Sequence, residues 1–338
     1  MEPRSSTTFS VRAGGDPRTM AALAVHAEEM GFDQIWTGND LFGEPGLIAL
    51  TAMLSATETI RVGSGVIDPV SIHPVQIAQF SAGLQMFSGN RFMLGLGAGS
   101  QVFFDWAGLT PAAPVTRTRT AVRAVQALTR GESPAGLGKG FENWTDQAVL
   151  RQPAEVPVYV GAMGPKMLAM TGRYADGALP LCLPPGQVFD AREQIIAGAA
   201  AAGRDGNDLD IAACLWCSID DDADRARWIL AEHIALYSGS LSIDVLDRHG
   251  FDPEEFTHTQ RLMLDGNKSE AIKTVLASAT MLDLGIAGGV DDVIDQCSEL
   301  TGAGVRHLSF GPPMGADIAR AMTLLGEKAI PVLRREMS

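Results

Sequence analysis

Residues 9–37, FSVRAGGDPRTMAALAVHAEEMGFDQIWT, contain one complete strand–helix–strand unit, and much of the chain repeats it. The unit opens with a short β-type run at residues 9–12. Asp16 and Pro17 follow as a helix cap and a proline at the first helical position, which is typical of a helix start. Apolar residues then recur at helical spacing until a glycine ends the helix, and residues 32–37 form the next β-type run. The stretch predicts two strands joined by an amphipathic helix.

The same alternation of β-type runs and helical patterns continues along the chain. Further β-type runs are at residues 59–66, 91–97, 158–161, 178–181, 209–219 and 305–310. About eight such units predict an α/β fold in which the strands close into a (βα)8 TIM barrel. The barrel needs about 250 residues, so the surplus predicts insertions at residues 131–155 and 238–285, the second just before the last strand. Because no linker divides the chain, residues 1–338 are expected to form a single domain.

An open, doubly wound sheet is the alternative fold. It would need a glycine-rich dinucleotide-binding turn after an early strand. The run Gly95-Leu-Gly-Ala-Gly-Ser instead follows the fourth predicted strand and lacks the spacing of the third glycine. The pattern therefore favours the barrel.

Composition restricts the partners of the protein. The 26 Lys and Arg residues are outnumbered by 40 Asp and Glu residues, which gives a formal net charge of −14. Such a surface repels phosphate backbones and anionic lipids, so neither nucleic acid nor a membrane surface is expected as a partner. No apolar run approaches the roughly 20 residues of a transmembrane helix, and residues 1–16 lack the apolar segment of a signal peptide. We therefore expect a cytoplasmic protein.

The cysteines do not form a disulfide framework. Four cysteines are scattered along the chain, which fits a reducing compartment. Cys214 and Cys217 have the spacing of a redox or zinc motif, but they lie in a predicted strand, where residues three apart point to opposite faces. We interpret both as structural residues.

Reactive groups of a βα barrel lie at the C-terminal ends of its strands. In this chain those segments are rich in glycine and contain neither a Gly-x-Ser-x-Gly nor a His-Glu-x-x-His motif, and the six histidines are not clustered at metal spacing. Hydrolysis and metal catalysis are therefore not expected. A site built from backbone, small residues and aromatic residues suits an organic cofactor that supplies the chemistry.

The strongest phosphate-binding candidate is the run Gly161, Ala162, Met163 and Gly164. It follows a predicted strand and precedes a predicted helix, so free amides and the positive end of the helix would face an anion. The alternative is an ordinary turn that uses glycine for its backbone freedom.

Three polar residues follow the first two predicted strands. Arg12 ends the first strand, where it either binds an anion at the barrel mouth or is a surface residue. Asn39 and Asp40 follow the second strand and are either site residues or a helix cap and loop pair.

Five runs of the sequence carry a family resemblance over nearly the whole chain. They are AEEMGFDQIW (27–36), TETIRVGSGV (57–66), SGNRFMLGLGAGS (88–100), VPVYVGAMGPKML (156–168) and residues 302–315. The chain resembles the luciferase-like monooxygenase superfamily. Within it, the chain is similar to methylenetetrahydromethanopterin reductases that use coenzyme F420 and to their bacterial F420-dependent oxidoreductase relatives.

The resemblance implies a barrel that binds coenzyme F420, an 8-hydroxy-5-deazaflavin, with its phosphate at residues 161–164. It also implies a cis peptide between Gly65 and Val66, on which the deazaflavin ring rests, and the conformational freedom of Gly65 is expected to matter there. Ser100 falls on the cofactor side of the site. Relatives that dehydrogenate sugars carry a glutamate where Ser100 stands, so that chemistry is not expected.

Departures from the family pattern concern the substrate. The family pattern has an acidic residue and then a histidine after the second strand. This chain has Asn39 and Asp40 at these two positions, so its acid lies one residue later. The reductases have an acidic group at the end of the first strand, and this chain has Arg12 at that position. An arginine cannot donate a proton at neutral pH. An arginine there favours a substrate with negative charge, such as a carboxylate or phenolate.

The sequence therefore predicts an F420-dependent oxidoreductase of the methylenetetrahydromethanopterin reductase type, which transfers a hydride between the reduced deazaflavin and a small organic, anionic substrate. Two alternatives remain open, namely an FMN-dependent luciferase-like monooxygenase and a flavin-binding barrel without catalytic activity. A homo-oligomer, either a dimer or a tetramer, is expected.

Overall fold

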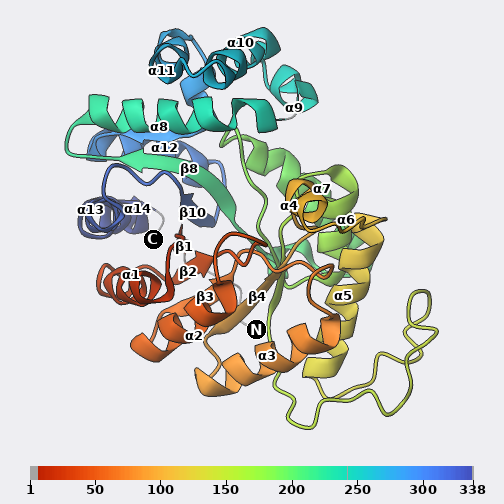
Figure 1. The fold of residues 1–338 in the computed structure, drawn as a ribbon. Helices are drawn as coiled ribbons and strands as arrows, with labels where there is room; N and C mark the ends of the chain where they lie inside the picture. The colour runs from red at the N-terminus through yellow and green to blue at the C-terminus, as the bar shows by residue number, and fades with distance from the viewer. Residues whose placement is uncertain (1–6, 242, 337–338) are drawn as a thin grey trace. The chain divides into compact units, whose positions relative to one another are not determined.

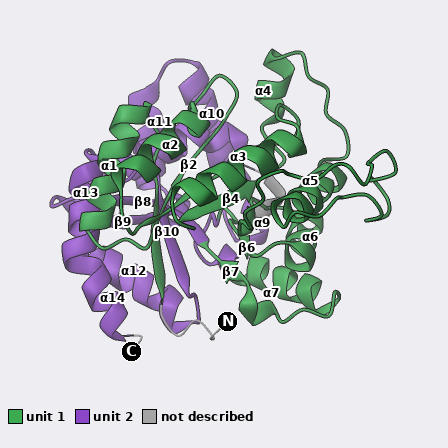
Figure 2. Cartoon of the chain, turned by 90° about the horizontal axis from the view of Figure 1, so that it is seen from below, with its two compact units in different colours: residues 1–181, 189–212 green, residues 182–188, 213–338 purple. Residues whose placement is uncertain are grey.

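The computed structural model describes residues 7–241 and 243–336, which form two compact units (Figure 2). The first contains the chain up to residue 181 and residues 189–212, and the second contains residues 182–188 and the chain from residue 213 onward. Neither unit is one continuous stretch of the chain. That residues 1–338 form a single domain stays a prediction. The first six residues of the segment 1–16, where no signal peptide is expected, lie outside the described residues.

In the first unit, parallel strands alternate with helices along the chain (Figure 1). Its strands, all paired in parallel in the order β7-β6-β5-β4-β3-β2-β1, are β1 (Thr8–Arg12), β2 (Gln34–Thr37), β3 (Arg61–Ser64), β4 (Phe92–Leu96), β5 (Val158–Val160), β6 (Gly177–Ala178) and β7 (Asp210–Ile211). Its helices are α1 (Pro17–Glu29), α2 (Gly46–Ala56), α3 (Pro74–Phe87), α4 (Gln101–Trp106), α5 (Pro114–Thr129), α6 (Pro165–Tyr174) and α7 (Gln187–Ala200), the first two residues of α7 being assigned to the second unit.

The predicted start and end of the first helix are confirmed. The Asp16 side chain caps α1 by accepting hydrogen bonds from the amides of Arg18 at 2.9 Å and Thr19 at 3.2 Å, and Pro17 is the first helical residue. Gly31, with φ +76°, turns the chain back toward β2 in a conformation that favours glycine.

A buried polar network joins three strands inside the first unit. The Tyr159 hydroxyl on β5 donates to the Asp210 carboxylate on β7 at 2.7 Å, and the Gln34 amide on β2 lies 3.4 Å from the same carboxylate. Trp36 donates to Gln34 at 3.0 Å and packs edge-on against Tyr159, with ring centroids 5.1 Å apart. Because buried polar groups require partners, this network fixes how these strands pack together.

In the second unit the strand order is β10-β8-β9, again parallel. Its strands are β8 (Ala213–Ile219), β9 (Ile286–Gly288) and β10 (His307–Gly311). Its α-helices are α8 (Ala223–Tyr237), α9 (Ile243–Arg248), α10 (Pro253–Leu264), α11 (Lys268–Ala277), α12 (Val290–Gly302), α13 (Ile318–Leu324) and α14 (Ile330–Glu336).

Some strand predictions differ from the structure. The run 178–181 shares only residue 178 with β6. The run 209–219, expected to be one strand, is divided into β7 and β8, which belong to different units. The three-residue strand β9 was not predicted; it comes directly after the stretch 238–285, so that stretch does not immediately precede the last strand. Cys214 and Cys217 lie on β8 as expected, both buried and without a disulfide, and burial raises the pKa of Cys217 to about 12.

The two stretches predicted as insertions differ in structure. Residues 131–155 contain no helix or strand and run as a long loop after α5 (Figure 1). Residues 238–285 carry α9, α10 and α11. None of the helices in the described residues is both long and apolar enough to cross a membrane.

Glu28 connects the end of α1 to the turn before β3. Its carboxylate accepts hydrogen bonds from the amides of Glu58 at 3.1 Å and Ile60 at 2.8 Å, from the amide of Thr59, and from the Thr59 hydroxyl at 2.8 Å. Burial opposes ionisation, but these donors outweigh it and lower the pKa of Glu28 to about 2.

Replacing Glu28 by glutamine should make the protein less stable at neutral pH and less sensitive to acid. The folded pKa lies below the ordinary value of 4.5, so the contribution of Glu28 is complete above that value and is lost as the pH falls toward about 2. Urea unfolding at neutral pH and at about pH 3 tests this. The difference in unfolding free energy between wild type and Glu28→Gln should shrink in acid, and an equal difference at both pH values would contradict the assignment.

Candidate cofactor site

The residues predicted for the site lie after neighbouring strands of the first unit. Because these strands are parallel and adjacent, their C-terminal ends share one edge of the sheet. The predicted residues are Arg12 at the end of β1, Asn39 and Asp40 after β2, Gly65 and Val66 after β3, Ser100 after β4, and Gly161, Ala162, Met163 and Gly164 after β5.

The segment after β3 is tied to the strands on both sides of it. The peptide between Gly65 and Val66 is cis, which confirms the prediction from the family resemblance. The Gly65 amide donates to the Thr37 carbonyl at 2.7 Å. Beyond it, the Ile67 amide donates to the Gly95 carbonyl at 2.9 Å. Residues 65–67 are therefore held between β2 and β4.

The half-buried Val66 side chain lies between two glycines of the neighbouring strand ends. A Cβ atom on Gly97 would lie 2.4 Å from Val66 Cγ2, and one on Gly161 would lie 3.0 Å from Val66 Cγ1. A Cβ on Gly65 would make only an ordinary contact with Trp36 at 3.6 Å, and Gly65 is not in the left-handed region. The close approach that requires glycine is therefore at Gly97, and the expected need for conformational freedom at Gly65 is wrong.

Gly97→Ala should destabilise the protein by about 1 to 3 kcal/mol, because its methyl group overlaps Val66 and overpacks this segment. Urea unfolding measures the loss. Gly302→Ala at the end of α12 is the control, since nothing lies within 4 Å of its added Cβ and its helical position favours alanine. The double variant Gly97→Ala/Val66→Ala removes the overlapping methyl groups and should recover part of the stability. A Gly97→Ala protein as stable as wild type would contradict the packing described here.

The loop after β5 has backbone amides without a backbone acceptor. The Gly161 amide is already used, because it donates to the Leu96 carbonyl at 2.8 Å. The amides of Ala162, Met163 and Gly164 donate to no backbone group of the described residues. Gly164 is the N-cap of α6, and nothing lies within 4 Å of where its Cβ would be. The loop thus has three available donors, open space and the positive end of a helix, a combination that fits a phosphate.

Asn39 is not the N-cap of α2, which is Pro45, but its side chain contacts the first turn of that helix. Its Oδ1 accepts a hydrogen bond from the Leu47 amide, in the first turn of α2, at 3.3 Å. A Cβ on Gly46 would lie only 2.6 Å from the Asn39 Cβ, so this helix start packs directly on Asn39. The residue therefore fixes where α2 begins beside the site.

Asp40 belongs to a group of three carboxylates. Burial raises the pKa of Asp40, and the negative charges of Asp68 and Glu44 raise it further. Glu44 accepts from the Gly15 amide at 2.9 Å, and Asp68 accepts from the Ser71 amide at 2.7 Å. Glu44 and Asp68 were not predicted as site residues. Asp68 lies next to one of the family-like runs, whereas no sequence signal pointed to Glu44.

Exposed aromatic side chains flank this acidic group. Phe42, in the loop after β2, is 69% exposed, and Trp106 at the end of α4 is 67% exposed. Their ring centroids are 6.1 Å apart, and Phe103 lies 5.4 Å from Trp106. Large exposed aromatic groups of this kind are typical of a binding surface.

Arg12 and Ser100 complete the predicted set. Arg12 is half-buried and lies in register with Trp36 of β2. Ser100 is the half-buried N-cap of α4, and its side chain makes no capping hydrogen bond. Within the described residues there is no group of His, Cys, Asp and Glu side chains that could hold a metal ion.

Comparison with known proteins gives relatives along almost the whole chain. The family model described as luciferase-like monooxygenase matches residues 4–307. The 5,10-methylenetetrahydromethanopterin reductase of Archaeoglobus fulgidus is 32% identical over 311 residues, which cover 91% of this chain and 93% of the relative. The F420-dependent glucose-6-phosphate dehydrogenase of Nakamurella multipartita is 28% identical over 335 residues, covering 94% of this chain and 93% of the relative.

A solved structure agrees with this result. The coenzyme F420 dependent tetrahydromethanopterin reductase of Methanopyrus kandleri matches with a TM-score of 0.88 and 28% identity, covering 97% of this chain and 99% of the other. The match confirms the predicted α/β fold of the luciferase-like TIM-barrel type and excludes the open, doubly wound alternative. The chain belongs to the luciferase-like monooxygenase family.

Proposed function

We propose that this chain is an oxidoreductase that binds coenzyme F420 and transfers a hydride between the reduced deazaflavin and a small organic, anionic substrate. The observation that carries the proposal is the loop at residues 162–164, where three amides with no backbone acceptor precede the start of α6. Similarity to F420-dependent enzymes over more than nine-tenths of the chain supports the choice of cofactor.

Residues of the first unit would hold the cofactor. The amides of Ala162, Met163 and Gly164 would bind its phosphate, and the ring would rest on Val66, with Ser100 on the same side. When bound, the cofactor supplies the hydride. The chain contributes position and electrostatics, which is the usual division of work in cofactor enzymes.

Asp40 and Arg12 would act on the substrate. A carboxyl group with a raised pKa keeps its proton at higher pH than an ordinary aspartate, so Asp40 is suited to hold or transfer a proton. Arg12 stays charged and would bind the anionic group of the substrate. Phe42 and Trp106 would cover the apolar part of the substrate and exclude water.

Turnover under anaerobic conditions tests this function. Reduced F420 is mixed with the protein and with unsaturated carboxylates or phenolates, and oxidation of the deazaflavin is followed by absorbance. We expect oxidation that requires both protein and an anionic substrate. Methylenetetrahydromethanopterin is the comparison substrate and should react more slowly, because Arg12 occupies the position of the acid. Tight cofactor binding without turnover of any substrate would contradict the proposal and favour a flavin-binding barrel without catalytic activity.

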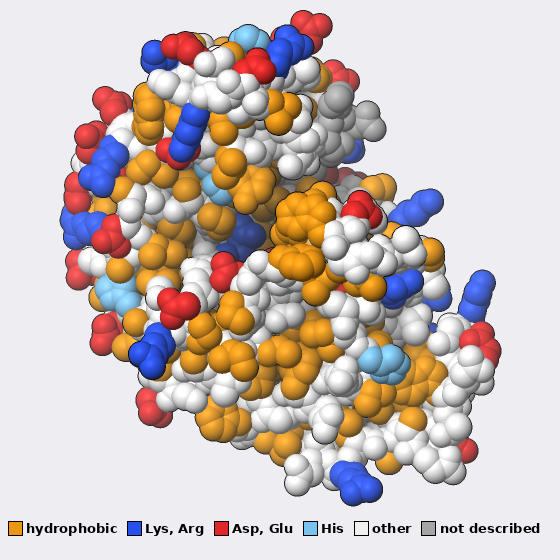
Figure 3. All heavy atoms as spheres, in the orientation of Figure 1, with side chains coloured by type: hydrophobic (Ala, Val, Ile, Leu, Met, Phe, Trp, Pro, Cys, Tyr) orange, Lys and Arg blue, Asp and Glu red, His pale blue; other side chains and the backbone are white. Residues whose placement is uncertain are grey.

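We further propose a homo-oligomer, a dimer or a tetramer, that uses the apolar faces of α2 and α3. Ile48 of α2 is 63% exposed, and Met86 and Phe87 of α3 are 48% and 59% exposed. Figure 3 shows hydrophobic side chains over these two helices. A patch of this kind is typical of a protein interface. Analytical ultracentrifugation measures the state directly, and a monomer at micromolar concentration would contradict this assignment.

A cytoplasmic location remains part of the proposal. Its support is the state of the four cysteines, which are all buried and form no disulfide.

A further inference from the structure

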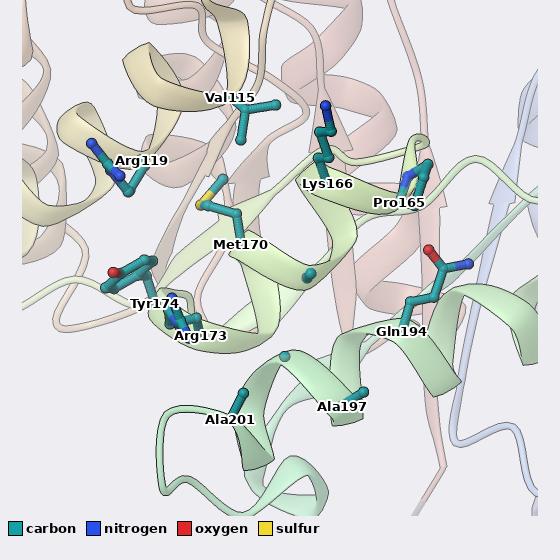
Figure 4. A pocket seen from close by; sticks show the side chains of 12 residues that line it. Val115, Arg119, Pro165, Lys166, Met170, Arg173, Tyr174, Gln194, Ala197 and Ala201 are labelled. Carbon is teal, nitrogen blue, oxygen red and sulfur yellow. The ribbon is translucent and has the colours of Figure 1, made fainter.

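A groove on the first unit, formed by α5, α6 and α7, has the features of a second binding site. It encloses about 620 Å³, a volume that suits a small organic molecule. Figure 4 shows the side chains that line it. The lining begins at Pro165 on α6, so the loop at residues 162–164 proposed to bind the cofactor phosphate is not part of it.

The floor of the groove is mostly apolar. Val115 of α5 and Met170 of α6 point into it, and Ala197 and Ala201 line the side formed by α7 and its end (Figure 4). Small side chains on α7 leave the space open. A ligand with an apolar body would bury these surfaces.

Three cations line the same groove. They are Arg119 on α5, Lys166 near the start of α6 and Arg173 near its end, and no lining residue is acidic. Across residues 7–241 and 243–336, none of these three side chains forms a hydrogen bond or ion pair. Because the whole chain carries a net charge of −14, three unpaired cations around one groove are a local exception that attracts anions.

Two buried polar atoms beside the groove also lack partners. Arg119 Nε and Gln194 Oε1 are buried, and neither has a hydrogen-bond partner among the described residues. Nearly all buried polar atoms of folded proteins are satisfied, so unsatisfied ones need a reason. Figure 4 shows Arg119 on the α5 side of the groove and Gln194 on the α7 side, so a ligand that spans the groove would bring a polar group to each.

We propose that this groove binds an organic anion with an apolar body, for example a carboxylate or phosphate on a hydrophobic skeleton. The Arg119 guanidinium binds the anionic group, with Lys166 and Arg173 adding positive charge. Met170 and the alanines of the α7 side pack against the body. The site is separate from the proposed cofactor site, and it does not depend on the assignment of coenzyme F420.

The test uses 8-anilinonaphthalene-1-sulfonate, an organic anion with an aromatic body, titrated calorimetrically into the full-length protein with and without F420. We expect one binding event that F420 does not displace. Arg119→Met should raise the Kd at least tenfold, equivalent to about 1.4 kcal/mol. Ala197→Trp, which fills the groove without changing the charge, should also abolish binding.

Arg192→Met is the matched control for charge. Arg192 is exposed on α7, which forms one side of the groove, but it does not line the groove, and its replacement removes the same positive charge. Its Kd should equal that of wild type. N-phenyl-1-naphthylamine has the same skeleton without the sulfonate. Its Kd should be the same for Arg119→Met and for the wild type. Equal Kd values for the Arg119 and Arg192 variants would overturn the proposal, as would displacement of the sulfonate by F420.

Discussion

Arg12→Ala should weaken the binding of an anionic substrate by about 1.5 to 3 kcal/mol, the range for a hydrogen bond to a charged group. This corresponds to roughly a 10- to 150-fold rise in Kd. Arg12 ends β1 and is half-buried beside β2, at the edge where the other predicted site residues lie. With a net charge of −14 on the chain, an anion needs a local cation to bind there.

Steady-state kinetics with an anionic substrate and its neutral ester measures this effect. The alanine variant should lose kcat/KM for the acid and keep it for the ester, and its affinity for F420 should be unchanged. Arg12→Lys keeps the charge but loses the bidentate geometry of the guanidinium. Its kcat/KM for the acid should therefore lie between those of the wild type and the alanine variant. Equal losses for the acid and the ester would show that Arg12 does not recognise the anion.

Gly164→Asp should lower the affinity for the cofactor at least tenfold, or about 1.4 kcal/mol. The new carboxylate would lie at the N-cap of α6, among the amides that would bind the phosphate, and would both repel the phosphate and compete for its donors. The side chain fits, because nothing lies within 4 Å of the added Cβ. Aspartate is a favourable N-cap residue, so folding should not suffer.

Gly164→Asn is the matched control, since it has the same shape and no charge. It should bind the cofactor nearly as tightly as wild type in a fluorescence titration, while the aspartate variant does not. If the two variants bind equally, the phosphate does not lie at this helix start.

The parts of the fold that could be predicted have local causes. Asp16 and Pro17 specify the start of α1 through capping and a fixed φ, and both act within a few residues. The strand β9 has only three residues, including an alanine and a glycine, so it shows no alternation of apolar and polar residues. The break between β7 and β8 falls within one continuous apolar run, where periodicity carries no information.

The candidate site could be predicted only where the chain places residues directly after a strand. The loop at residues 161–164 was found in this way. The hydrogen bond from the Gly161 amide to Leu96 could not be predicted, because it depends on the pairing between β4 and β5. Gly97 was indistinguishable from its neighbouring glycines, because its contact with Val66 joins distant parts of the sequence. The negative charge of Glu44 raises the pKa of Asp40 through space, and no sequence motif indicates this interaction.

Binding of F420 in comparison with FMN is the most direct test of the proposed function. Purified protein is titrated with each oxidised cofactor, and the quenching or shift of cofactor fluorescence gives the two Kd values. We predict at least tenfold tighter binding of F420, and loss of this binding in Gly164→Asp but not in Gly164→Asn. Equal or tighter binding of FMN would contradict the deazaflavin assignment and indicate an FMN-dependent member of the family.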